Sequence, residues 1–201
     1  AGSAAPHIPS ILTAAGTAIA FADIYAAHAL YGFIGPAAAF VLLGAVGIVT
    51  MIAAAIHGPA LAGLGLAGSY VTPLLVSSQA PNPWPVVIFL AVVAAAAHLL
   101  ARTRRWLWLA AVATAGAVAW GFVLLAQSQT GSPGAGPDHV WVWAAMIHTL
   151  VQLGLAGALI AIEPHLGSDE VDAPIDWIAT GILAALAFLA ITVIAMAPFG
   201  D

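Results

Sequence analysis

The chain has 201 residues, of which 63% are hydrophobic and 5% are charged, and its net charge is −5. Soluble domains carry roughly a quarter charged residues, so this composition excludes an ordinary water-soluble protein. Only three residues are basic, so nucleic acid is not an expected partner. The absence of cysteine excludes disulfides and thiolate metal sites.

The apolar residues run continuously for about 20 positions at a time, which is the length that crosses a bilayer as a helix. The sequence therefore predicts an all-α, polytopic transmembrane helical bundle of about seven spans, with the lipid bilayer as its first partner. The spans, in chain order, are residues 10–30, 36–56, 60–78, 85–101, 106–126, 140–162 and 175–197. Residues 1–201 are expected to form one integral membrane domain. Because glycine and proline are frequent between 127 and 139, two sub-bundles at 10–126 and 140–198 are the alternative.

The third span is unlike the others because glycine, proline and polar side chains interrupt it. The candidate site residues in and after this span are Gly65, Ser69, Tyr70, Thr72, Pro73 and Asn82. Proline has no N–H, so the carbonyl of Ser69 loses its usual helical donor. We therefore expect the span to be kinked or broken near Pro73, with an unwound turn at 70–73. We also expect it to pack tightly through Gly65 and Ser69, because small residues let membrane helices approach closely.

The basic residues predict the topology. Arg102, Arg104 and Arg105 all lie between the fourth and fifth spans. The positive-inside rule places this loop in the cytoplasm, for a multi-pass protein of a bacterial inner membrane. The chain then starts in the cytoplasm and ends outside.

Asp23 is the most informative single residue because it lies well inside the first span. A carboxylate at the centre of a bilayer costs about 2.5 to 3.5 kcal/mol, so such residues usually face the protein interior and have a function. Thr13, Gly16, Thr17, Ala20 and Asp23 form a small-polar stripe at helical spacing, which should meet another helix. Asp23 is therefore either a proton-linked or substrate-contacting group, or a hydrogen-bonded residue that joins two helices.

His148 and Gln152 complete the candidate buried polar site with Asp23. They are four residues apart, so they share one helix face. They can line a polar path through the membrane, or they can form one interhelical hydrogen bond. The histidines lack the close pairing of a metal site, so no metal is expected. The common catalytic motifs are also absent, so no catalytic residue and no cofactor is predicted.

Two segments carry a family resemblance. Residues 30–36, Leu-Tyr-Gly-Phe-Ile-Gly-Pro, and residues 59–77, with Leu-Ala-Gly-Leu-Gly-Leu-Ala-Gly-Ser at 61–69, resemble a bacterial family of predicted membrane proteins, domain-of-unknown-function family 2339. Asn82, Pro83 and the pair Arg105-Trp106 continue the resemblance, which covers roughly Leu12 to Trp120. The chain departs from the pattern at Gly68-Ser69, where two glycines are usual, and at Asp23. Members are generally longer, and the resemblance implies no reaction, cofactor or substrate.

Three functions fit these observations. The leading hypothesis is a transport or permeation module, or one part of a larger membrane assembly, because transporters use broken helices and buried acids. The alternatives are a membrane enzyme for a lipid-linked or cell-envelope substrate, and a structural scaffold that binds other membrane helices or subunits.

Overall fold

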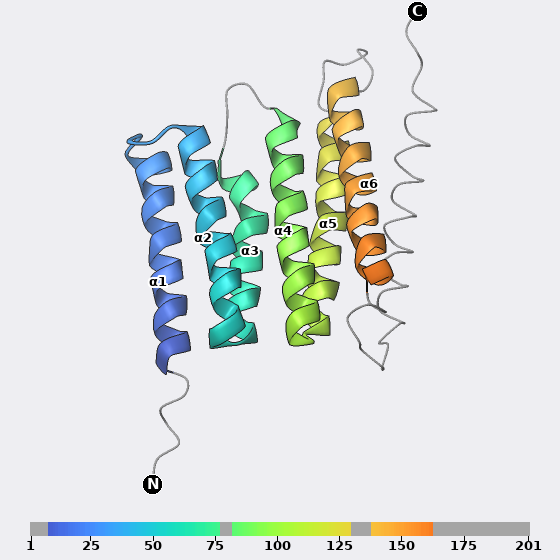
Figure 1. Cartoon of the computed structure of the whole chain (residues 1–201). Coiled ribbons are helices and arrows are strands. Elements are labelled where there is room, and N and C mark those ends of the chain that lie inside the picture. The colour runs from blue at the N-terminus through green and yellow to red at the C-terminus, as the bar shows by residue number, and fades with distance from the viewer. Residues whose placement is uncertain (1–7, 77–81, 130–137, 163–201) are drawn as a thin grey trace, which may run out of the picture. The chain divides into compact units, whose positions relative to one another are not determined.

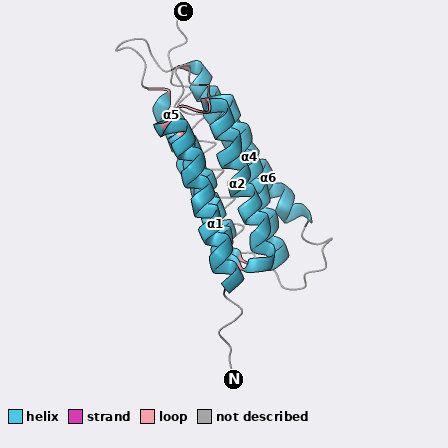
Figure 2. Cartoon of the chain, turned by 90° about the vertical axis from the view of Figure 1, so that its left-hand side faces the viewer, coloured by secondary structure: helices cyan, strands magenta, loops and turns pink. Residues whose placement is uncertain are grey.

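The structure is a computed structural model that describes residues 8–76, 82–129 and 138–162, and these residues form helices and loops without a strand (Figures 1 and 2). The predicted all-α fold is confirmed. The helices are α1 (Ile8–Tyr25), the π-helical turn η1 (Ala26–Leu30), α2 (Pro36–His57), α3 (Pro59–Leu75), α4 (Pro83–Arg104), α5 (Leu107–Gln127) and α6 (His139–Ile162). They correspond to the first six predicted spans, while the seventh lies outside the described residues.

Four of the described helical segments are long and apolar enough to cross a membrane. They are Ile8–Leu30, Pro36–His57, Pro83–Arg104 and Trp108–Gln127. The apolar segments Pro59–Leu75 and His139–Leu155 are shorter. Three helices start at a proline, whose missing N–H and fixed φ suit the first helical turn.

The interruption near Pro73 differs in form from the prediction. α3 stays helical through Pro73 and ends at Leu75, after which Val76 is extended, with φ −104° and ψ 95°. No unwound turn is therefore present at 70–73. Because Pro73 lies in the last turn of the helix, its lost hydrogen bond affects the helix end and not the helix middle.

Chain contacts divide the protein into two units. Unit 1 is Ala1–Pro81 with Leu99–Leu109, and unit 2 is Asn82–His98 with Ala110–Asp201. The predicted division into 10–126 and 140–198 uses a different boundary and stays a prediction.

In unit 1, α1, α2 and α3 lie side by side (Figure 1), and the tightest packing joins α2 to α3. A Cβ atom added to Gly65 would lie 2.8 Å from the carbonyl oxygen of Gly47 and 2.9 Å from the backbone nitrogen of Met51. A Cβ atom added to Gly47 would collide with the hydroxyl of Ser69. The two backbones approach this closely because glycine occupies both positions. The predicted tight packing through Gly65 and Ser69 is confirmed.

Unit 2 has its own apolar core. Its central buried side chains come from three helices and are Val87, Leu124, Ala144 and Ala145, with Leu125, Trp141 and Ile147 packed against them. At one end of this unit, the N–H of Asp138 donates to the carbonyl oxygen of Ser128 at 2.9 Å. This bond ties the end of α5 to the start of α6, so the two helices run antiparallel.

Candidate functional site

The outward face of α1 carries Asp23. This residue is exposed, and it is the one acidic residue within the described helices. Phe21, two positions earlier, packs towards α3, where a Cβ atom added to Gly68 would meet its ring. Two residues correspond to about 200° around a helix, so Asp23 points away from α3. Among the residues that the structure describes, none therefore buries Asp23.

The inward face of α1 shares only part of the predicted stripe. Ser10 donates a hydrogen bond from its hydroxyl to the carbonyl oxygen of His57 at 2.7 Å, and Thr17 lies 3.1 Å from Thr50, oxygen to oxygen. Thr17 is the one buried residue of α1. Of the predicted stripe, Thr17 meets α2, whereas nothing lies within 4 Å of a Cβ atom added to Gly16.

At its C-terminal end, α1 continues into the wider turn η1, which begins at Ala26. In this π-helical segment the N–H of Tyr31 donates to the carbonyl oxygen of Ala26 at 3.0 Å. His28 then bonds through Nδ1 to the carbonyl oxygen of Ile34 at 3.0 Å. Because a carbonyl oxygen can only accept, Nδ1 of His28 carries the proton in this bond.

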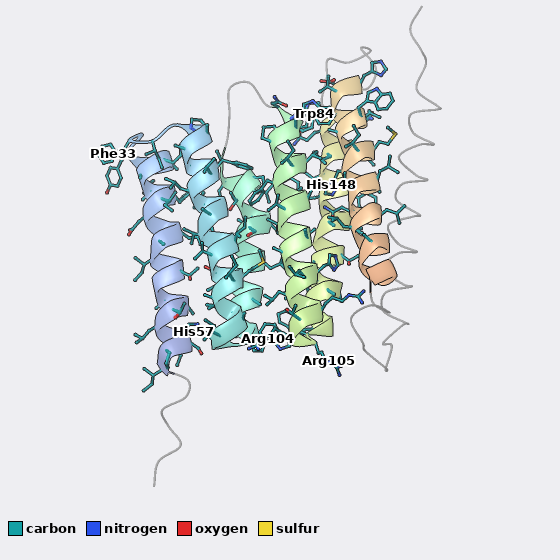
Figure 3. The ribbon with its side chains drawn as sticks, in the orientation of Figure 1. Phe33, His57, Trp84, Arg104, Arg105 and His148 are labelled. Atoms are coloured by element: carbon teal, nitrogen blue, oxygen red, sulfur yellow. The ribbon has the colours of Figure 1, made fainter. Side chains whose placement is uncertain are left out.

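The arginines gather at the opposite end of unit 1. Arg104 donates to the carbonyl oxygen of Ala55 near the end of α2, and its guanidinium carbon lies 5.8 Å from the ring centre of Trp106. Figure 3 shows Arg104 and His57 at the same end of this unit and Phe33 at the other end. α1 starts beside His57, so Asp23 and the arginines lie towards opposite ends of unit 1.

The turn after α4 is closed by backbone bonds in a Schellman motif. The N–H of Trp106 donates to the carbonyl oxygen of Ala101 at 2.8 Å, and the N–H of Arg105 donates to that of Arg102 at 3.3 Å. Arg105 takes the left-handed conformation that this motif requires, with φ 55°. Glycine is the usual residue at this position because it has no Cβ atom to strain.

Three of the candidate residues in and after the third span form hydrogen bonds within a helix or at its end. Ser69 donates from its hydroxyl to the carbonyl oxygen of Gly65, and Thr72 donates to that of Gly68, both at 2.8 Å. Asn82 accepts a hydrogen bond at its Oδ1 from the N–H of Trp84 at 3.1 Å, as a residue at a helix start does. Tyr70 is half-buried. The hydrogen bonds of Ser69, Thr72 and Asn82 shape and close their helices.

The interior of unit 2 holds the second polar group. His148 is 1% exposed and Gln152 is 2% exposed, and both project from α6. His148 bonds through Nε2 to the carbonyl oxygen of Ala117 on α5 at 3.0 Å, and Gln152 reaches the carbonyl oxygen of Leu90 on α4 at 3.4 Å. His148 and Gln152 thus connect α6 to α5 and to α4. Figure 3 shows His148 part-way along α6.

Thr114 belongs to the same interior and was not expected from the sequence. Its side chain is 5% exposed. Within the described part of the chain, its hydroxyl and Nδ1 of His148 are the two buried side-chain polar atoms without a hydrogen-bond partner. The sequence gives only a threonine inside a span, and its significance depends on the register between α5 and α6.

Comparison with known proteins identifies the family. The profile of a family described as "Predicted membrane protein (DUF2339)" matches residues 3–200. The chain belongs to this family. The predicted resemblance over Leu12 to Trp120 is therefore confirmed and extends over nearly the whole chain. The chain is accordingly a multi-pass membrane protein that sits in a lipid bilayer. No curated protein and no solved structure matches it.

Proposed function

We propose that the protein is a helical module of a larger membrane assembly and that α1 docks it onto a neighbouring membrane helix. The observation that carries this proposal is the outward direction of Asp23 on a membrane-crossing helix. The neighbour is a helix of another polypeptide that presents a basic side chain at the depth of Asp23.

The depth of Asp23 supports a protein partner rather than lipid. The segment Ile8–Leu30 has 23 residues and is therefore about 34 Å long. If it is centred in a hydrocarbon core of about 30 Å, Asp23 lies about 8 Å inside the core boundary, because it precedes Leu30 by seven residues. An aspartate side chain is too short to reach the headgroups from there, so a lipid-facing carboxylate is strongly disfavoured.

The distribution of basic residues in this chain indicates that the partner of Asp23 is not a second copy of the chain. The three basic residues of this chain lie at 102–105. Arg104 is held near the end of α2, beside the start of α1, and is thus remote from Asp23. A second copy in the same orientation places the same arginines at the same membrane level, so it supplies no arginine or lysine to Asp23.

The surface beside Asp23 is shaped for a close approach. Ile19 is four positions before Asp23, and Gly16 is seven positions before it, so all three share a face. Ile19 is 60% exposed, and the space next to Gly16 is open. Glycine in such a face lets a second helix come near enough for a hydrogen bond at Asp23.

Cross-linking in native membranes tests the proposal, since the chain has no cysteine of its own. Ile19→Cys, treated with a bifunctional thiol-to-amine reagent, is expected to give an adduct with a membrane protein that carries a basic residue inside a span. Ile52→Cys on α2 is the matched control, because Ile52 is equally exposed, at 64%, but has no acidic neighbour on its helix.

The adduct must depend on the carboxylate. Adding Asp23→Leu to Ile19→Cys is expected to abolish it, and Asp23→Asn is expected to weaken it. An adduct that persists with Asp23→Leu, or one that contains only a second copy of this chain, contradicts the proposal.

A permeation role is the second candidate, and the polar interior of unit 2 is the observation that favours it. His148 and Gln152 lie near the middle of α6, where lipid offers no hydrogen bonds. Reconstituted into vesicles, the protein should then pass protons or small polar solutes, and His148→Ala should reduce that flux. Unchanged fluxes and growth in cells with His148→Ala and Asp23→Asn would remove the basis for transport.

The alternative of a membrane enzyme has less support. Asn82 is one of the candidate site residues after the third span, and its amide oxygen accepts the N–H of Trp84 at the start of α4. We further propose that the membrane is the bacterial inner membrane and that the loop at 102–105 is cytoplasmic, since all three arginines lie there.

A further inference from the structure

Unit 2 contains two buried polar atoms whose hydrogen-bonding capacities are complementary. The hydroxyl of Thr114 and Nδ1 of His148 both lack a partner among the described residues, although their side chains are 5% and 1% exposed. An unpaired buried polar group is costly, and native structures rarely leave one without water or a ligand.

The bond from His148 to α5 determines what Nδ1 can do. Nε2 lies 3.0 Å from the carbonyl oxygen of Ala117, which can only accept, so Nε2 carries a proton. In the neutral imidazole, Nδ1 is then an acceptor with a free lone pair. The hydroxyl of Thr114 can donate and accept.

The register between α5 and α6 places Thr114 and His148 about one helical turn apart along the helix axes. Asp138 bonds to Ser128 at the helix ends, and His148 bonds to Ala117 further along the same antiparallel pair. Counting from Ser128 and Asp138, Thr114 lies at the level of Gln152, one helical turn from His148. One turn is a rise of about 5.4 Å along the axis, which is longer than a direct hydrogen bond and leaves room for a bridging water.

Thr114 and His148 lie at a depth where lipid cannot supply a hydrogen-bond partner. Thr114 lies within one turn of the middle of α5, and His148 lies within one turn of the middle of α6. At this depth the bilayer core offers neither donors nor acceptors.

We propose that unit 2 binds water inside the membrane, between α5 and α6, with Thr114 Oγ1 and His148 Nδ1 as its protein ligands. The water donates one O–H to the lone pair of His148 Nδ1 and accepts the O–H of Thr114. Gln152 lies at the same level and closes the polar region towards α4. This site is independent of the docking role of α1 and does not require that the protein transports anything.

The direction in which Thr114→Val changes the unfolding midpoint tests the site. Thr114→Val keeps the shape of the side chain and removes its hydroxyl. If Thr114 binds water, this change strands His148 and lowers the unfolding midpoint of the full chain in lipid. If the hydroxyl is unpaired, removing it relieves a desolvation cost and raises the midpoint, which overturns the proposal.

Thr149→Val is the matched control. Thr149 is equally buried, at 3% exposed, but its hydroxyl donates to Ala145 on its own helix, so its loss should shift the midpoint less than that of Thr114. Thr114→Ser keeps a hydroxyl and is expected to retain most of the stability.

Nitrogen NMR of the histidine-labelled chain gives a second, direct readout. The wild type is expected to show His148 with a protonated Nε2, an unprotonated Nδ1 and magnetisation transfer from water to the His148 ring. Thr114→Val should remove that transfer and leave the Nε2 proton in place. Transfer from a protein hydroxyl instead of water, or a protonated Nδ1 in the wild type, overturns the proposal.

Discussion

The hydroxyl of Thr17 on α1 donates to the hydroxyl of Thr50 on α2, across 3.1 Å. The direction follows from a second bond, since Thr50 uses its own hydrogen to donate to the carbonyl oxygen of Val46 at 2.7 Å. Each hydroxyl has one hydrogen, so Thr50 can only accept from Thr17.

This direction predicts unequal effects at the two positions. Thr50→Val leaves the buried Thr17 without its acceptor, whereas Thr17→Val leaves Thr50 bonded to Val46. Hydrogen bonds between membrane helices are worth about 0.6 kcal/mol on average, and a stranded buried group adds roughly 1 kcal/mol or more. We expect Thr50→Val to lower the free energy of unfolding more than Thr17→Val does, measured by denaturation in mixed micelles. Equal losses would show that the assigned direction is wrong.

The contact between α2 and α3 predicts that Gly65→Ala is destabilising. Its new methyl group would press on the backbones of Gly47 and Met51, which cannot move like a flexible side chain. Overpacking of this kind costs about 1 to 3 kcal/mol in the free energy of unfolding. Gly16→Ala is the control because its methyl enters open space, and it should be neutral or stabilising by roughly 0.5 to 1 kcal/mol. A neutral Gly65→Ala would contradict the close packing.

Gly58 and Arg105 are two loop residues with positive φ, and substitutions there should change stability in opposite directions. Gly58 joins α2 to α3 with φ 108° and ψ 173°, a conformation that is essentially restricted to glycine. Gly58→Ala should therefore cost about 1 to 3 kcal/mol of unfolding free energy. Arg105→Gly should gain about 1 kcal/mol, because it relieves the left-handed strain at φ 55°. Thermal unfolding of both variants checks the pair, and a loss of stability with Arg105→Gly would go against this account of the turn.

The proposed topology predicts the labelling of single cysteines in intact cells. Phe33 lies in the loop between η1 and α2 and is 80% exposed, so Phe33→Cys should react with a membrane-impermeant thiol reagent from outside. Thr103→Cys, within the arginine segment, should react only after the cells are opened. The reverse pattern would place the arginines outside and invert the assigned orientation.

The sequence predicted the helices well because membrane spans depend on length and apolar content, which need no knowledge of packing. Details that depend on neighbours were less accessible. Pro73 indicated an unwound turn, but its place in the last turn of α3 depends on where the helix ends, at Leu75. The close approach at Gly65 was predictable, since glycine permits it whatever the partner.

In the candidate site, too, the features that depend on neighbouring helices were not predictable from the sequence. The stripe from Thr13 to Asp23 indicated a helix contact, but not which edge of the stripe meets α2. Among the stripe residues, Thr17 makes the hydrogen bond to α2. Asp23 is therefore outside this contact between α1 and α2. Thr114 gained significance only from the register that His148 sets with Ala117.

The π-helical turn η1 has a consequence for the aromatic residues that follow it. Tyr31 and Phe33 stack with ring centres 5.4 Å apart, and both are exposed at the end of the first span. Such side chains anchor a helix at the headgroup level. A π turn is one residue wider than an α turn, so it acts as a single-residue insertion that rotates everything after it by about 100°. The direction in which this aromatic anchor faces is thus fixed by one extra residue in Ala26–Leu30, and deleting one alanine there would turn the anchor to another side of α1.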